Sequence, residues 1–209
     1  MKLTKYGHAC FTVEKDGKML VVDPGGFSPD FIAPENVVAV VITHEHGDHF
    51  DAEQLEAVID KNPEAIILGP EAVTSKIEAF QTKPVEPGET FPIGPFRLTF
   101  FGGRHATIHS SMTPIANVGV LINDLLYYPG DSFAIPDTSV DTLALPAAAP
   151  WMNIGEAIDF LVAIKPRLAF PTHDAILSVE GKEIVDRMLA QVAQQNGTVY
   201  QRVDGSIDI

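Results

Sequence analysis

The octet Thr43-His44-Glu45-His46-Gly47-Asp48-His49-Phe50 brings several metal-binding side chains together within one short stretch of sequence. Its three histidines and Asp48 follow an apolar run at residues 37–42, Val-Val-Ala-Val-Val-Ile, that is typical of a buried strand. A histidine-rich turn after a rigid strand can direct several lone pairs to one point, as a transition-metal site requires. Gly47 has no Cβ, so we expect it to let the backbone fold tightly between neighbouring ligands. The octet therefore predicts a metal site rather than an ordinary polar loop.

Length and composition indicate one sizeable globular domain that spans residues 1–209. Hydrophobic residues make up 45% of the chain and charged residues 20%, which is enough apolar material for a proper core. The formal net charge of −14, from 14 basic and 28 acidic residues, repels nucleic acids and anionic membrane surfaces. We therefore expect a small-molecule substrate, no nucleic-acid partner and no membrane partner.

The sequence shows no pattern typical of a signal peptide or of a membrane-spanning helix. No segment has the apolar length of a signal peptide, and none approaches the ~20 apolar residues of a membrane-spanning helix. Cys10 is the only cysteine, so the chain has no internal disulfide, and it is expected to be a buried strand residue. These features predict a cytoplasmic protein and leave its oligomeric state open.

Short apolar segments and amphipathic stretches indicate a protein that mixes strands and helices. Strands are expected at residues 3–6, 9–14, 19–22, 37–43, 65–68, 96–101, 118–122, 125–128 and 142–145. Helices are expected after Asp51, at residues 154–164 and at residues 180–195. The last helix is expected to pack on the core through one face, formed by Ile184, Val185, Met188, Leu189 and Val192. These patterns alone give a fold class of α/β or α+β.

The octet resembles the His-x-His-x-Asp-His signature of the metallo-β-lactamase superfamily, and the resemblance extends over nearly the whole chain. It is carried further by Tyr6-Gly7-His8-Ala9-Cys10-Phe11, by Tyr128-Pro129-Gly130-Asp131-Ser132 and by Phe170-Pro171-Thr172-His173. The chain is most similar in character to short metal-dependent hydrolases related to ascorbate-phosphate lactonases. The resemblance implies an α+β fold, a four-layer αββα sandwich in a single domain. Its active site would lie at one edge of the sandwich, in loops that follow strands.

The same resemblance implies two metal ions and a set of ligands for each. His44, His46 and His105 would bind the first metal, Asp48, His49 and His173 would bind the second, and Asp131 would bridge both. Zn²⁺ is the metal best matched to these donors, two ions per chain being expected, and Mn²⁺, Fe or Ni²⁺ fit them as well. A hydroxide shared by the two metals would be the nucleophile, and Asp48 would be catalytic by orienting it.

The sequence leaves two possible roles open for several residues near this ligand set. The third histidine of the first site is His105 or His109, and His105 is favoured because it follows the preceding strand more closely, after Gly102-Gly103. His109 would then line the substrate pocket or be an ordinary loop residue. His8 either orients a ligand by a hydrogen bond or is a structural histidine. Asp23 is expected to be a structural carboxylate or to support a ligand.

The substrate pocket is the least defined part of the expected site. Trp151 and Met152 either line an apolar pocket, together with Phe27 and Phe133, or pack in the core. Arg104 either clamps a phosphate or carboxylate of the substrate or is a solvated surface residue. Asp174, directly after His173, stands where an aromatic residue is expected in the most similar relatives.

Together these features predict a metal-dependent hydrolase, dinuclear in zinc, that acts on a small ester, lactone or phosphoester. Two other classes of protein fit the same fold. One is an iron-dependent oxidoreductase of the persulfide-dioxygenase type, and the other is a non-catalytic metal-binding protein.

Overall fold

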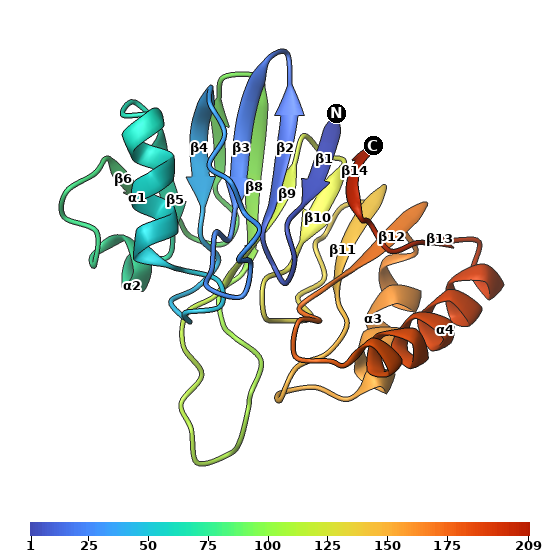
Figure 1. The fold of residues 1–209 in the computed structure, drawn as a ribbon. Coiled ribbons are helices and arrows are strands. Elements are labelled where there is room, and N and C mark those ends of the chain that lie inside the picture. The colour runs from blue at the N-terminus through green and yellow to red at the C-terminus, as the bar shows by residue number, and fades with distance from the viewer.

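The computed structural model describes residues 1–209 and forms two seven-stranded β-sheets with helices on their outer sides (Figure 1). The strand orders are β14-β1-β2-β3-β4-β5-β6 and β13-β12-β11-β10-β9-β8-β7. Helices α1 and α2 flank the first sheet, and α3 and α4 flank the second. The expected four-layer αββα sandwich is confirmed.

The first sheet is built from the N-terminal part of the chain and closed by its last strand. Its strands are β1 (Lys2–Lys5), β2 (Phe11–Lys15), β3 (Lys18–Val22), β4 (Val37–Val41), β5 (Ile66–Gly69), β6 (Thr82–Pro84) and β14 (Gly205–Asp208). β14, β1, β2 and β3 pair antiparallel, whereas β3 to β6 pair parallel. The parallel part needs crossover connections, and these contain α1 (Ala52–Lys61) and α2 (Glu71–Thr74).

The second sheet follows the same plan, with an antiparallel part and a parallel part. Its strands are β7 (Thr90–Ile93), β8 (Phe96–Gly102), β9 (Val118–Ile122), β10 (Leu126–Tyr128), β11 (Thr142–Pro146), β12 (Leu168–Thr172) and β13 (Val199–Tyr200). β7 to β10 pair antiparallel, and β10 to β13 pair parallel. Helices α3 (Ile154–Ile164) and α4 (Val179–Gln195) provide crossovers of the parallel part.

Three hydrophobic clusters explain why the molecule has four layers. The largest lies between the sheets and includes Phe11, Phe100 and Phe170. The other two fill the space between each sheet and its helices. β4 contributes Ala39 to the first cluster and Val40 to a second, so both of its faces are buried. Burial on both faces is the reason that this strand is a continuous apolar run instead of an alternating one.

Helix α4 differs from its expected packing. Leu189 and Ala193 are buried, but Ile184 is 49% exposed and Met188 is 40% exposed. The prediction that the whole apolar face packs on the core is therefore wrong for these two residues. The helix contacts α3 and β13, and its buried residues Leu189 and Ala193 are four positions apart and so lie on the same side of the helix.

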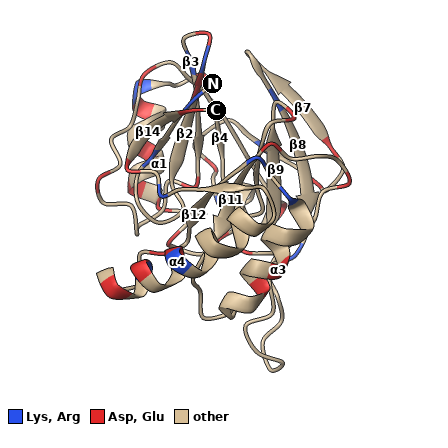
Figure 2. Ribbon diagram, turned by 90° about the vertical axis from the view of Figure 1, so that its right-hand side faces the viewer, with Lys and Arg blue, Asp and Glu red and all other residues tan.

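The helices of the structure carry many acidic side chains. Aspartate and glutamate side chains are spread over α1, α3 and α4 (Figure 2). None of the helices combines the length and apolarity needed to cross a membrane.

Loops that carry the sequence motifs meet at one edge of the sandwich. The octet follows β4, residues 103–117 follow β8, residues 129–141 follow β10, and His173 follows β12. The segment between β8 and β9 is a long loop that extends away from the body of the molecule (Figure 1). The two sheets thus deliver side chains from both halves of the chain to a common place.

Candidate metal centre

Two groups of potential metal ligands lie side by side at this edge. One contains His44, His46, His105 and Asp131, and the other contains His8, Asp48, His49 and His173. Within each group, one ligand atom from every member lies within 4.8 Å of those of the others. The structure therefore brings together every residue expected to bind metal and adds His8 to them.

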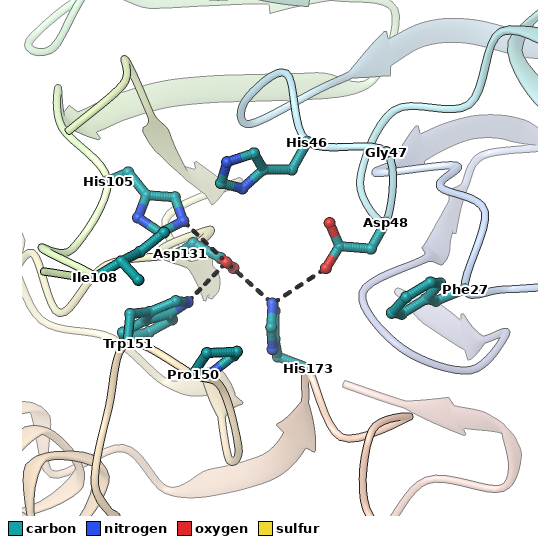
Figure 3. A pocket seen from close by; sticks show the side chains of 10 residues that line it. All are labelled: Phe27, His46, Gly47, Asp48, His105, Ile108, Asp131, Pro150, Trp151 and His173. Atoms are coloured by element: carbon teal, nitrogen blue, oxygen red, sulfur yellow. Dashed lines mark hydrogen bonds and ion pairs between the residues drawn. The ribbon is translucent and has the colours of Figure 1, made fainter. Parts of the chain in front are cut away.

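Asp131 lies between the two groups (Figure 3). Its Oδ2 is 3.2 Å from His105 Nε2 in the first group and 3.0 Å from His173 Nε2 in the second. Its Oδ1 is 3.2 Å from His49 Nε2. One carboxylate that reaches both groups has the position that a bridging ligand needs.

The turn that presents Asp131 is fixed by a residue that the sequence did not single out. Asn117 Oδ1 accepts a hydrogen bond from the Asp131 backbone N–H, and its Nδ2 donates to the carbonyl oxygen of Pro129. Gly130 in the same turn has φ of 62°, and a Cβ on it would lie 2.3 Å from Asn117 Oδ1. Asn117 lies at the far end of the long loop, so no local sequence signal connects it with the site.

Hydrogen bonds at the back of the imidazoles fix which nitrogen faces the centre. The Nδ1 atoms of His105 and His173 lie 2.6 Å and 2.7 Å from the carbonyl oxygens of Ala106 and Ala148. His49 Nδ1 lies 2.7 Å from Asp23 Oδ2. Carbonyl and ionised carboxylate oxygens only accept hydrogen bonds, so each Nδ1 carries the proton. In the neutral ring, each Nε2 then presents a lone pair to the site.

The buried carboxylate of Asp23 orients the site residues that follow β4 of the first sheet. It accepts hydrogen bonds from the backbone N–H and the hydroxyl of Thr43 and from the Tyr128 hydroxyl, as well as from His49. Because the Thr43 hydroxyl proton is used on Asp23, its oxygen is free to accept from His44 Nδ1 at 3.0 Å. His44 is therefore also held with Nε2 toward the centre.

Four of the atoms that face the centre have no hydrogen-bond partner. His49 Nε2, His105 Nε2, His173 Nε2 and Asp131 Oδ1 are buried and lack any aligned partner. Buried polar atoms in this state cost free energy, and native proteins rarely leave them unpaired. Imidazole nitrogens and carboxylate oxygens are the donors that Zn²⁺ and related divalent cations prefer. The donor set therefore fits a pair of divalent cations.

His8 lies close to the second group of ligands, but its ring has no free lone pair directed at the centre. Its Nδ1 accepts a hydrogen bond from the Ala175 backbone N–H at 3.2 Å, so the ring proton is on Nε2. That N–H then donates to Asp48 Oδ2 at 3.1 Å. His8 presents no lone pair to the centre, and its contact orients the Asp48 carboxylate.

Nearby carboxylates hold protons on two of the histidines when no cation is bound. Burial opposes charge on His49, but Asp131 and Asp23 outweigh it and raise the pKa of His49 well above its ordinary value. At His173 burial is likewise outweighed by Asp131 and Asp48, which raise its pKa to about 9. For His46 burial, reinforced by His105, lowers the pKa.

These shifts predict that the metal-free protein releases protons when it takes up cations. With a pKa of about 9, His173 is protonated at pH 7.5 and must lose its proton before Nε2 can bind a metal. Metal affinity should therefore rise with pH up to pH 9, by about tenfold per pH unit for each released proton. Isothermal titration calorimetry in buffers of different ionisation enthalpy measures this release. Uptake without proton release, and with the same affinity at pH 6.5 and pH 9, would contradict the prediction.

A pocket of about 450 Å³ opens onto the centre (Figure 3). Besides centre residues it is lined by Phe27, Gly47, Ile108, Pro150 and Trp151. The Trp151 indole N–H donates to Asp131 Oδ2 at 2.9 Å, so this residue both lines the pocket and holds the carboxylate between the groups. From the sequence, Trp151 was expected only to line the pocket or to pack in the core.

Three other pocket candidates lie elsewhere. Arg104 and His109 are exposed on the long loop and do not line the pocket. His109 Nδ1 accepts from the Ser111 backbone N–H within the same loop. Met152 packs against the hydrophobic cluster between the second sheet and its helices.

The glycine that permits the octet's backbone conformation is Gly25, outside the octet. A Cβ on buried Gly25 would lie 1.9 Å from the Asp48 carbonyl oxygen. A Cβ on Gly47 would have no atom within 4 Å, and Gly47 is not among the residues with positive φ. The expectation that Gly47 is needed for a tight turn is therefore wrong. The close contact is between two loops that are separated in the sequence, so no local pattern indicates it.

Comparison with known proteins agrees with this fold and site. The model of the beta-lactamase superfamily domain matches residues 2–173. Protein Rv0786c of Mycobacterium tuberculosis is 37% identical over 88% of this chain and 89% of its own length. The UPF0173 protein PF0020 of Pyrococcus furiosus is 32% identical over 83% of each chain. The chain therefore belongs to the beta-lactamase superfamily, in its UPF0173 branch.

Two further proteins extend the comparison. A UPF0173 metal-dependent hydrolase of Carboxydothermus hydrogenoformans is 26% identical over 83% of this chain and 84% of its own. The solved structure of Igni18, a metallo hydrolase from Ignicoccus hospitalis, superimposes with a TM-score of 0.77. It is 19% identical, covers 100% of this chain and 98% of its own, and so shows a shared fold.

Proposed function

We propose that this chain, a metal-dependent hydrolase of the beta-lactamase superfamily, uses two zinc ions to hydrolyse a small ester, lactone or phosphoester. The observation that carries the proposal is the set of buried, unpartnered Nε2 and Oδ1 atoms that converge beside a pocket. In the metal-free protein these buried atoms have no aligned hydrogen-bond partner, and with cations bound they would become ligands.

The ligand set divides between the two groups described above. His44, His46 and His105 would hold one cation, Asp48, His49 and His173 the other, and Asp131 would contact both. The chemistry that such cations supply when bound is acidification of a water molecule and polarisation of the substrate's acyl or phosphoryl oxygen. Zn²⁺ is proposed because imidazole nitrogens predominate among the donors.

Asp48 has the position to orient the attacking water by accepting a hydrogen bond from it. It lines the pocket and its side chain is 21% exposed, in contrast to the buried Asp131. Burial raises the pKa of Asp48, but the His173 ring 3.5 Å away and the hydrogen bond from His8 outweigh this effect and hold the pKa well below its usual range. Asp48 therefore stays ionised at neutral pH and can accept hydrogen bonds on both oxygens. The His8 contact keeps one of these oxygens in a fixed orientation.

The test combines elemental analysis with a substrate panel. Native protein is expected to contain two equivalents of zinc and to hydrolyse members of a panel of aryl esters, lactones and phosphodiesters. His44→Ala should lose metal and turnover, and Asp48→Ala should lose turnover by about 100-fold or more. His109→Ala is the matched control, since His109 lies on the long loop outside the pocket, and it should keep both. Protein without transition metal, or full activity in Asp48→Ala, would overturn the proposal.

The panel also separates hydrolysis from the iron-dependent alternative. An oxidoreductase of the persulfide-dioxygenase type consumes dioxygen, whereas hydrolysis does not. Oxygen uptake by iron-loaded protein with a persulfide, together with no turnover of any ester, would replace the proposed function.

A further inference from the structure

We propose that the pocket selects an uncharged substrate, an ester, thioester or lactone with an apolar substituent, and disfavours one that carries a distal phosphate or carboxylate. This inference rests on the proposed hydrolase function and names the substrate class of the same site. It depends on the apolar side chains that surround the centre and on the lack of lysine and arginine among them.

The walls of the pocket beyond the candidate ligands are apolar. Ile108, Trp151 and Pro150 lie together on one side of the centre, and Phe27 lies on the opposite side, beyond Asp48 (Figure 3). Phe27 is 49% exposed and Ile108 is 40% exposed, so both keep apolar surface in contact with water. An apolar substituent of the substrate would cover this surface and gain the free energy of its removal from water.

No lysine or arginine lines the pocket. Of the basic residues elsewhere near this edge, Lys76 pairs with Glu45, and Arg202 pairs with Asp174 and Asp186. Arg104 is exposed on the long loop and lies outside the pocket. Proteins that recognise a phosphate or carboxylate usually supply such a cation, often as a bidentate arginine. A distal anionic group on the substrate would find no partner here.

Helix N-termini do not replace the missing cations. The α3 N-terminus follows Trp151 closely in sequence, but the capping box of Asn153 and Glu156 uses two of its N–H groups, and neither residue lines the pocket. Asp51 caps α1 after the octet in the same way by accepting from the Gln54 N–H. The formal net charge of −14 further disfavours an anionic substrate at long range.

A second, smaller hollow extends the apolar surface on the other side of Ile108. It has a volume of about 50 Å³ and shares His46, His105 and Ile108 with the main pocket. Its remaining wall comes from the long loop and includes Met112 and Ile115. A substrate that reaches past Ile108 would therefore meet more apolar side chains.

Trp151 is the only tryptophan in the chain, which gives a binding signal independent of turnover. Holoenzyme would be titrated with two hydroxamates of equal length that share the metal-binding group and end in either a methyl group or a carboxylate. The methyl-terminated compound should change Trp151 fluorescence at an about tenfold lower concentration. Equal or tighter binding of the carboxylate-terminated compound would overturn the inference.

Turnover of matched esters provides the second measurement. 4-Nitrophenyl butanoate should have a kcat/KM about tenfold above that of the acetate, since each buried methylene contributes about fourfold. The succinate monoester, of the same length with a distal carboxylate, should fall below the butanoate. Preference for the succinate monoester would overturn the inference while leaving the hydrolase function in place. If neither ester is cleaved, hydrolysis of simple acyl esters is excluded, and the hydroxamate titration still decides the selectivity.

One substitution should reverse the preference. Ile108→Lys places a cation on the pocket wall and should favour the carboxylate-terminated hydroxamate and the succinate monoester by about tenfold. Ile184→Lys on α4 is the matched control, because Ile184 is 49% exposed and does not line the pocket. Its preference and metal content should equal those of the original chain. An unchanged preference in Ile108→Lys with full metal content would contradict the assignment of this wall.

Discussion

Asp131→Ala should cost the protein both cations and lower kcat/KM by about 1000-fold. The Asp131 carboxylate contacts histidines of both ligand groups, so its removal withdraws one donor from each. It also leaves the Trp151 N–H without its acceptor. A metal centre contributes several kcal/mol to transition-state stabilisation, and about 4 kcal/mol corresponds to this loss. Elemental analysis of the purified variant, followed by kinetics with added Zn²⁺, measures both effects.

Asp124→Ala is the matched control for this substitution. Asp124 forms an exposed ion pair with Arg97, and such pairs contribute little to stability. The control variant should retain both metals and full activity. Retention of two equivalents of zinc in Asp131→Ala would show that this carboxylate does not join the two groups.

Gly25→Ala should destabilise the fold by about 3 kcal/mol, because the added Cβ meets backbone rather than a flexible side chain. The new atom would lie 1.9 Å from the Asp48 carbonyl oxygen and 2.4 Å from the His49 nitrogen. The loop that contains Gly25 or the octet loop must then move, and movement of the octet loop would displace the candidate ligands. The midpoint of thermal unfolding should fall by about 6–12 °C, as measured by calorimetry, and metal content should fall with it.

Gly47→Ala is the control that separates steric conflict from a general effect of glycine replacement. No atom lies within 4 Å of a Cβ at this position, so thermal stability should change by less than about 2 °C. Metal content should remain that of the original chain. Equal destabilisation by the two substitutions would mean that the octet loop requires flexibility rather than space beside Gly25.

The sequence predicted those features that depend on neighbouring residues. The octet places four candidate ligands after one strand, and the buried character of that strand is visible in its uninterrupted apolar run. The positions of His105, Asp131 and His173 came from resemblance to a family, since no local pattern connects residues so far apart. The four-layer sandwich came from the same resemblance, whereas composition alone left two fold classes open.

Features that depend on contacts between distant segments could not be predicted. The ring proton of His8 is placed by the backbone N–H of Ala175, which belongs to the other end of the chain. The need for glycine at position 25 arises from the approach of a separate loop. Ile184 is exposed although it belongs to the apolar face of α4, because amphipathic spacing does not encode which part of a helix its neighbours cover.

The distribution of candidate ligands over the two sheets ties the architecture to the supply of metal. Each proposed cation would take donors from the octet, which follows a strand of the first sheet, and from loops of the second sheet. Cation binding would thus fasten the two halves of the sandwich to each other. At a free metal concentration about 1000 times the dissociation constant, each ion would add about 4 kcal/mol to the free energy of unfolding. The resistance of this protein to heat and proteolysis would then vary with the zinc status of its surroundings.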